Sequence, residues 1–121
     1  MAVVTRDEVK RVFRGNVAAG ATDSVETESV PTGQRWQIAT VVFADQGIGD
    51  SKSGAYSFEW GTTGAWDLVE AAYLTGNTWR QELNRVFTGD GTKRFRIRRQ
   101  NTSAVARDMV VILTGFKRIG G

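Results

Sequence analysis

The sequence predicts an all-β fold, namely a single antiparallel β-sandwich or jelly roll of about seven to eight short strands. Fourteen glycines and one proline are spread among short β-branched and aromatic runs over the 121 residues. Several of these runs alternate apolar and polar residues with a period of two, which is the pattern of a half-buried strand. Turn signals separate the runs, and no Pro-rich or Ser-rich linker divides the chain. We therefore expect one domain that covers residues 1–121.

The amino-terminal segment, residues 5–14, is compatible with a helix or with a strand. Thr5 and Glu8 have the spacing of a helix capping box, and apolar residues with helical spacing follow them. Residues 9–14 also fit a strand at the edge of a sheet. We favour the strand.

Two turns are expected after this segment. Residues 18–22 connect it to a strand near 24–30. Residues 31–34 then form a turn, because Pro31 restricts φ and Gly33 accepts a positive φ.

The run at 35–44 predicts a central strand, because it is rich in β-branched and aromatic residues. Its apolar positions change phase between Ile38 and Val41, which indicates a β-bulge or burial on both faces. Residues 45–54 are expected to form a long loop. An aromatic face with a period of two follows, formed by Tyr56, Phe58 and Trp60.

The last third of the chain begins with a second ambiguous segment. Residues 66–74 contain helix-favouring residues, but they are short and bounded by glycines, so we slightly favour a strand. The Asp-Gly reversal at 88–92 predicts a hairpin between the strand before it and the strand at 93–99. A turn at 101–104 precedes a final buried strand, 109–113, that ends near Phe116.

The composition excludes most catalytic chemistry. The chain has no Cys and no His, so it has no disulfide, thiolate nucleophile, imidazole base or His-ligated metal. An acidic loop with Asp45 and Asp50 lacks the spacing of a calcium-binding EF-hand. No spacing supports a glycosidase pair of Glu59 with Asp67 or Glu70. We expect no enzyme, no catalytic residue, no metal site and no cofactor.

Charge is distributed unevenly along the chain. Residues 1–90 contain 8 Lys and Arg against 12 Asp and Glu, whereas residues 91–121 contain 8 against Asp108 alone. This asymmetry indicates an acidic partner, which is nucleic acid or an acidic protein surface, including another copy of the chain. No apolar run is long enough for a membrane span and no cleavable signal peptide is evident, so we expect a soluble protein without a membrane partner.

The arginines of residues 94–99 are the sharpest candidate site. A period of two places Arg94, Arg96 and Arg98 on one face of a strand. Such a face is either a solvated surface that discourages aggregation or a patch that binds carboxylates of a partner. Nucleic acid is not favoured, because the neighbouring aromatic residues alternate inward rather than being exposed for base stacking. The candidate partner-binding residues are Arg94, Arg96, Arg98 and Arg99.

Three tryptophans fall in one third of the chain. Core packing is their default role, and an interface between subunits is the main alternative because rigid aromatic side chains anchor such contacts. Stacking on a sugar is a third interpretation. The candidate residues for an oligomer interface are Trp60, Trp66 and Trp79.

Several short turn motifs of the sequence together resemble those of one protein family. They are Gly20-Ala21-Thr22, Ser29 to Gln34, Phe87 to Lys93, and Arg96-Ile97 before Asn101 and Ser103. With them the chain resembles, over roughly residues 12–118, the small β-sandwich virion structural proteins of tailed bacteriophages. The resemblance implies a non-enzymatic part in capsid decoration or cementing, in a turret or head fibre, or in the tail. It carries no functional residues.

The resemblance also implies partners and a location. The chain would form a symmetric homo-oligomer, with a trimer favoured, and would contact the major capsid protein or another virion protein. It would assemble in the host cytoplasm and lie on the particle surface. We expect it to act by adhesion between proteins. The alternatives are a glycan- or receptor-binding β-sandwich module and a β-barrel that binds single-stranded nucleic acid.

Overall fold

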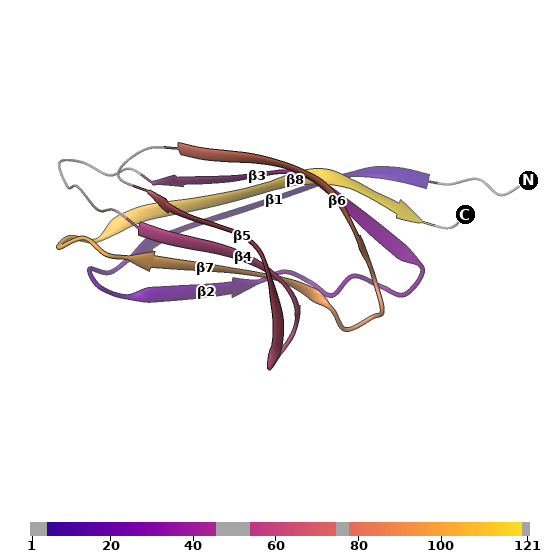
Figure 1. The fold of residues 1–121 in the computed structure, drawn as a ribbon, viewed down its shortest axis with the longest axis horizontal. Coiled ribbons are helices and arrows are strands. Elements are labelled where there is room, and N and C mark those ends of the chain that lie inside the picture. Colours follow the sequence, from indigo (N-terminus) through magenta and orange to yellow (C-terminus); the bar gives the residue numbers. More distant parts are fainter. Residues whose placement is uncertain (1–4, 46–53, 75–77, 120–121) are drawn as a thin grey trace, which may run out of the picture.

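The computed structural model describes residues 5–45, 54–74 and 78–119, which form eight β-strands (Figure 1). The strands are β1 (Thr5–Val17), β2 (Thr22–Glu26), β3 (Gln34–Asp45), β4 (Gly54–Thr62), β5 (Ala65–Leu74), β6 (Thr78–Thr88), β7 (Arg94–Asn101) and β8 (Arg107–Ile119).

The strands form two four-stranded antiparallel sheets, which lie as two layers in Figure 1. The strand order is β1-β8-β3-β6 in the first sheet and β2-β7-β4-β5 in the second sheet. Within this order only β4 and β5 are both consecutive in sequence and paired, whereas the chain otherwise crosses between sheets at each step. This double Greek-key arrangement is a jelly roll, so the predicted fold class is confirmed.

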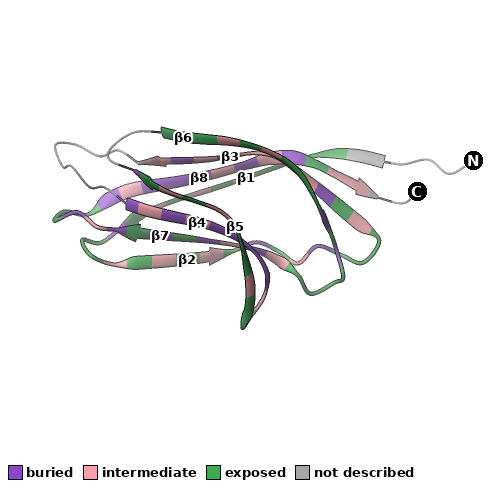
Figure 2. Cartoon of the chain, in the orientation of Figure 1, coloured by how far each residue is buried: buried purple, intermediate pink, exposed green. Residues whose placement is uncertain are grey.

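One hydrophobic core lies between the sheets, because alternate residues of each central strand point inward. Phe95 of β7 is its aromatic centre. Its ring contacts the rings of Trp36, Phe58, Trp60 and Phe87 at centroid distances of 4.6 to 6.0 Å. Figure 2 shows buried residues along the central strands of both layers, while β5 and β6 are largely exposed. The central strands are therefore rigid supports for the residues on the outer faces.

Both ambiguous segments are strands. Residues 5–14 belong to β1, and residues 66–74 belong to β5. The tight turn at 31–34 is also confirmed, with the Gln34 amide donating to the Pro31 carbonyl at 3.1 Å and Gly33 at a φ of 89°. In residues 5–14 and 66–74, hydrogen bonding to neighbouring strands overrides the weak helical preference of the sequence.

The phase change in the central strand is a β-bulge. The register of β3 shifts between Ile38 and Thr40. The shift keeps Ile38 and Val41 both fully buried, although an uninterrupted strand would point them to opposite faces. Beside the bulge, Gly115 of β8 approaches β3 so closely that a Cβ there would lie 2.0 Å from the Gln37 carbonyl oxygen.

The predicted hairpin around the Asp-Gly reversal is wrong. The strand before the reversal, β6, pairs with β3, whereas β7 pairs with β2 and β4 in the other sheet. The turn itself is present, but it crosses between the layers. An Asp-Gly pair specifies a change of direction, and pairing depends on which sheet buries each apolar face.

Two other boundaries differ from expectation. The final strand runs from Arg107 to Ile119, so it begins two residues before the predicted start at Met109 and ends three residues after Phe116. The second strand ends at Glu26 rather than near residue 30. The predicted loop at 45–54 falls mainly on residues 46–53, which lie outside the described residues.

We expect protonation of Asp90 to weaken the crossing between β6 and β7. The backbone N–H groups of Lys93 and Thr92 donate to its carboxylate and hold the pKa of Asp90 below its ordinary value of 3.8. A lowered folded-state pKa gives stabilisation that is complete above the ordinary value and is lost as the pH falls through the lowered one. NMR titration of the Asp90 carboxyl should therefore give a midpoint below 3.8.

The variant Asp90→Ala provides the thermal test of the same contact. It should melt at a lower temperature than the parent at about pH 7, and the difference should shrink as the pH falls through the lowered pKa of Asp90 and the parent carboxylate becomes neutral. A midpoint at or above the ordinary value, or a melting difference independent of pH, would contradict this role.

Candidate functional site

The outer face of the second sheet carries the arginine residues that the sequence singled out. Its four strands place outward side chains in rows across the sheet. Strand β7 contributes every second residue from Arg94 to Gln100 to these rows, as the period of two predicts. From β5 to β2, the rows are Leu68–Glu59–Arg96–Glu26, Ala71–Ser57–Arg98–Ser24 and Tyr73–Ala55–Gln100–Thr22.

Arg94 is bound by residues of its own chain. Its Nε donates to the Glu26 carboxylate of β2, and its Nη2 donates to the Thr63 hydroxyl at 3.0 Å. Its guanidinium carbon also lies 5.4 Å from the centre of the Trp66 ring. The charge of Arg94 is therefore balanced within the sheet.

Arg96 is held more tightly. It forms a bidentate pair with Glu59 of β4, with Nε–Oε1 at 3.1 Å and Nη2–Oε2 at 2.7 Å. The carboxylate belongs to a residue that is only 9% exposed, so water weakens this pair less than an exposed one. The Arg96 guanidinium carbon also lies 4.6 Å from the centre of the Trp66 ring, at cation–π distance. Glu59, which the sequence analysis weighed as one half of a glycosidase pair, therefore has its carboxylate bound to Arg96.

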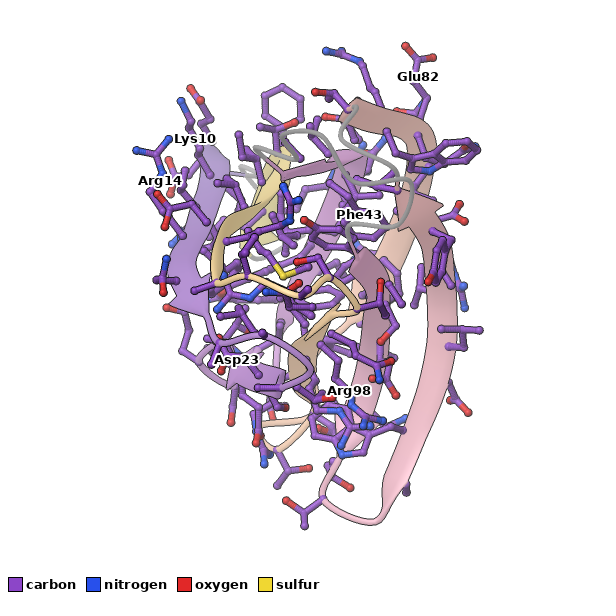
Figure 3. All side chains as sticks on the ribbon, turned by 90° about the vertical axis from the view of Figure 1, so that its left-hand side faces the viewer. Lys10, Arg14, Asp23, Phe43, Glu82 and Arg98 are labelled. Carbon is purple, nitrogen blue, oxygen red and sulfur yellow. The ribbon has the colours of Figure 1, made fainter. Side chains whose placement is uncertain are left out.

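Arg98 differs from these neighbours. Among the described residues it has no hydrogen bond and no ion pair, and its side chain is exposed. It lines a shallow hollow of about 190 Å³ with Thr22, Ala55, Tyr56, Ser57 and Gln100. Figure 3 shows Arg98 on the side of the molecule opposite Lys10 and Glu82. We call this feature the Arg98 hollow.

Arg99, the fourth candidate partner-binding residue, lies on the opposite face of β7 from the other three. Arg99 is 2% exposed and points into the sandwich, because the period of two that sends Arg98 outward sends Arg99 inward. It donates to the carbonyl oxygens of Phe13 and Met109 at 3.1 and 2.8 Å, and to the carboxylate of Asp23. Arg99 therefore connects strands of both sheets and is unavailable to a partner.

The three candidate interface tryptophans have different positions. Trp60 is 8% exposed and packs against Phe87 and Phe95 in the core, so it is unavailable to another subunit. Trp66 is half-buried beneath two arginines of the outer face. Trp79, on the edge strand β6, is 39% exposed. A role at an interface stays a prediction for Trp66 and Trp79.

Sequence reasoning missed a buried polar network at the end of β7. Asn101 is fully buried, and its side chain bonds to the backbone of Val17 and Val105 and to Ser103. Arg107 extends the network by donating to the Ser103 hydroxyl at 2.9 Å. The period of two in β7 could have indicated that Asn101 is buried, because it places residues 95, 97, 99 and 101 on the inward face together.

The outer face of the first sheet is of a different kind. Its central strands place Val42 of β3 beside Ile112 of β8, and both are partly exposed. Val12 of β1 continues the same row and is 52% exposed. Val110 lies in the next row and is 8% exposed, although it is not part of the core between the sheets. These side chains form a partly apolar surface on the outer face of the first sheet.

Neither outer face carries a metal centre in the part of the chain that the structure describes. No group of three or more Asp or Glu side chains lies close enough there to hold an ion. The acidic residues considered for calcium lie in or beside the segment 46–53, outside that part. No described helix is long and apolar enough to cross a membrane.

Comparison with known proteins identifies the fold and no family. No family model and no curated protein matches the chain. The Yersinia pseudotuberculosis-derived mitogen has a TM-score of 0.60 at 7% identity, over 88% of this chain and 85% of that chain. PirA has a TM-score of 0.53 at 14% identity, over 84% of this chain and 92% of that chain.

A viral protein also appears among the similar structures. The decameric BFDV capsid protein has a TM-score of 0.49 at 10% identity, over 97% of this chain and 99% of that chain. At such identities the mitogen and PirA establish a shared β-sandwich fold alone. The resemblance to virion proteins of tailed bacteriophages stays a prediction.

Proposed function

We propose that this chain is a structural protein of a virus particle that acts by adhesion between protein copies. A jelly roll is an architecture typical of capsid and lectin domains. The turn motifs that resemble those of virion structural proteins favour a capsid role over a lectin role. Its finer role is capsid decoration or cementing, or attachment as part of a turret or fibre. The observation that carries the adhesive role is the apolar outer face of the first sheet.

The contact that this face favours is with a second copy of the chain. In one row across the sheet, Lys10 of β1 and Glu82 of β6 lie at opposite ends, with threonines between them. Figure 3 shows Lys10 and Glu82 near opposite edges of this sheet. A two-fold axis parallel to the strands, between β8 and β3, places Lys10 of each copy opposite Glu82 of the other.

The same axis also matches the apolar row. It places Ile112 of one copy opposite Val42 of the other, and Val12 opposite Arg80, which ends this row on β6. Apolar side chains therefore meet at the centre, and the rim carries the pairs of Lys10 with Glu82. This is the usual anatomy of a protein interface. Among the described residues neither Lys10 nor Glu82 has an ion pair within its own chain, so both are available for this contact.

We expect charge reversal at the rim to weaken self-association, and exchange of the two charges to restore it. Glu82→Lys places two lysines opposite each other at both ends of the interface. The double variant Lys10→Glu with Glu82→Lys re-forms both pairs in the opposite sense. Sedimentation velocity should show self-association weakened by about tenfold for the single variant, with recovery in the double variant.

Ile112→Asp is the stronger disruption, and Leu68→Asp is its matched control. Leu68 is 63% exposed on the outer face of the second sheet, so the same charge there should leave the association unchanged. A parent chain that sediments as a monomer at all concentrations would refute the contact. The measured mass also distinguishes the dimer that this two-fold contact forms from the trimer that the sequence resemblance implies, and reading frames for head or tail proteins beside this gene would support the virion role.

A further inference from the structure

We propose that the Arg98 hollow binds a single acidic sugar residue, whose carboxylate pairs with the Arg98 guanidinium. The hollow lies on the outer face of the second sheet, away from the face assigned to self-association, and the inference does not depend on that assignment. Its walls come from three adjacent strands, β2, β7 and β4, which are hydrogen-bonded to one another. The wall residues are therefore held in place before a ligand arrives.

Arg98 has guanidinium donors available for a ligand, whereas the neighbouring arginines already pair with carboxylates of the same chain. Arg94 is paired with Glu26, Arg96 with Glu59, and Arg99 with Asp23. Arg98 has no such partner among the described residues. A guanidinium offers five N–H donors in a planar fork that matches a carboxylate. The nearby carboxylates are already neutralised by the other arginines, so an incoming anion meets no unpaired negative charge from them.

Polar groups lie beside Arg98 in the hollow. Thr22 and Ser57 present hydroxyls and Gln100 presents an amide, and each of these groups can both donate and accept hydrogen bonds. The Ser57 hydroxyl makes one long bond of 3.3 Å to Glu59, which leaves its acceptor sites available. Sugar hydroxyls also donate and accept, so they can satisfy all three groups. A peptide carboxylate offers acceptors alone and a free phosphate dianion offers a single donor, so both match these groups less completely.

The volume of the hollow is small. About 190 Å³ lies below the range of roughly 300 to 1,000 Å³ that is usual for sites of drug-sized ligands. The small side chains of Ala55 and Ser57 leave this space above the sheet. The hollow accommodates one ring with its carboxylate, and the rest of a glycan would extend into solvent across the open face.

The test is NMR titration of the nitrogen-15-labelled full chain with N-acetylneuraminic acid and with glucuronic acid. Both should shift the amide signals of Thr22, Ser57 and Gln100 in a saturable manner. Glucose tests the need for the carboxylate, while N-acetylglutamate and inorganic phosphate test the need for the sugar. We expect each of the three to bind about tenfold more weakly or not at all, because each lacks one half of the match.

Two variants localise the site, and one controls for charge. Arg98→Gln should lose about tenfold or more in affinity for the acidic sugars, and Ala55→Leu should block the hollow. Arg14→Gln removes another exposed arginine, from the first sheet, and should bind as the parent does. Thermal melting of each variant verifies that it is folded.

Four results would overturn the proposal. Unchanged affinity of Arg98→Gln for the acidic sugars would show that the Arg98 guanidinium does not contact the ligand. Equal affinity for glucose would show that the sugar carboxylate does not contribute to binding. Higher affinity for N-acetylglutamate or phosphate than for the acidic sugars would indicate a different class of ligand. Absence of shifts with both acidic sugars would refute the proposal while leaving self-association through the first sheet untouched.

Discussion

Replacing Asn101 by Asp should lower the free energy of unfolding by about 3 to 5 kcal/mol, because the side chain loses two donors inside the core. The Asn101 Nδ2 group donates to the carbonyl oxygens of Val17 and Val105, both at 2.8 Å. Its Oδ1 accepts from the Ser103 amide at 3.0 Å and from the Ser103 hydroxyl at 2.6 Å. Aspartate has the same shape, but it places a charged oxygen against two carbonyl oxygens where no water reaches.

Urea unfolding measures this effect, and Gln100→Glu is the matched control. Gln100 is the preceding residue on β7 and is exposed, so the same amide-to-acid change there should cost no more than about 0.5 kcal/mol. Burial raises the pKa of the new carboxyl at position 101, so the stability deficit should shrink as the pH falls and the group becomes neutral. Equal denaturation midpoints for Asn101→Asp and its parent would show that the network does not stabilise the fold.

Asn101 also shows how far the sequence alone leads. A period of two in β7 correctly separates the outward residues from Phe95 and Ile97, and it predicts inward positions for residues 99 and 101 as well. Composition argues against that placement, since arginine and asparagine are rarely buried without partners. Those partners are backbone carbonyls from β1, from β8 and from the turn that follows β7. The contacts with β1 join residues 84 and 86 positions apart, so they leave no local pattern in the sequence.

The same limit explains the error at the Asp-Gly reversal. Alternation and turn chemistry are local properties, and they correctly indicate the strands, the turn at 31–34 and the bulge in β3. The pairing of β6 with β3 and of β7 with β4 is decided by which apolar faces share one core. Local patterns therefore predict the β-sandwich class, whereas the separation of free from paired arginines requires the three-dimensional structure.

Arg99→Met should destabilise the fold by about 2 to 4 kcal/mol, because it removes a cation that joins the two sheets. The Arg99 guanidinium donates across the sandwich to the carbonyl oxygens of Phe13 in β1 and Met109 in β8. It also pairs with Asp23 of β2 within its own sheet. Methionine fills much of the same space, but it leaves those acceptors without donors.

The adjacent residue provides the control for this prediction. Arg98→Met changes the same residue type one position earlier on β7, yet Arg98 is exposed and unpaired among the described residues, so its cost should stay within about 0.5 kcal/mol. Arg99→Lys keeps the charge and loses the planar fork, so its denaturation midpoint should fall between those of the parent and Arg99→Met. Because Asp23 is partly exposed, adding Asp23→Asn to Arg99→Met should recover only a minor part of the loss. Full recovery in that double variant would mean that the ion pair, rather than the bonds to the two carbonyls, accounts for the contribution of Arg99.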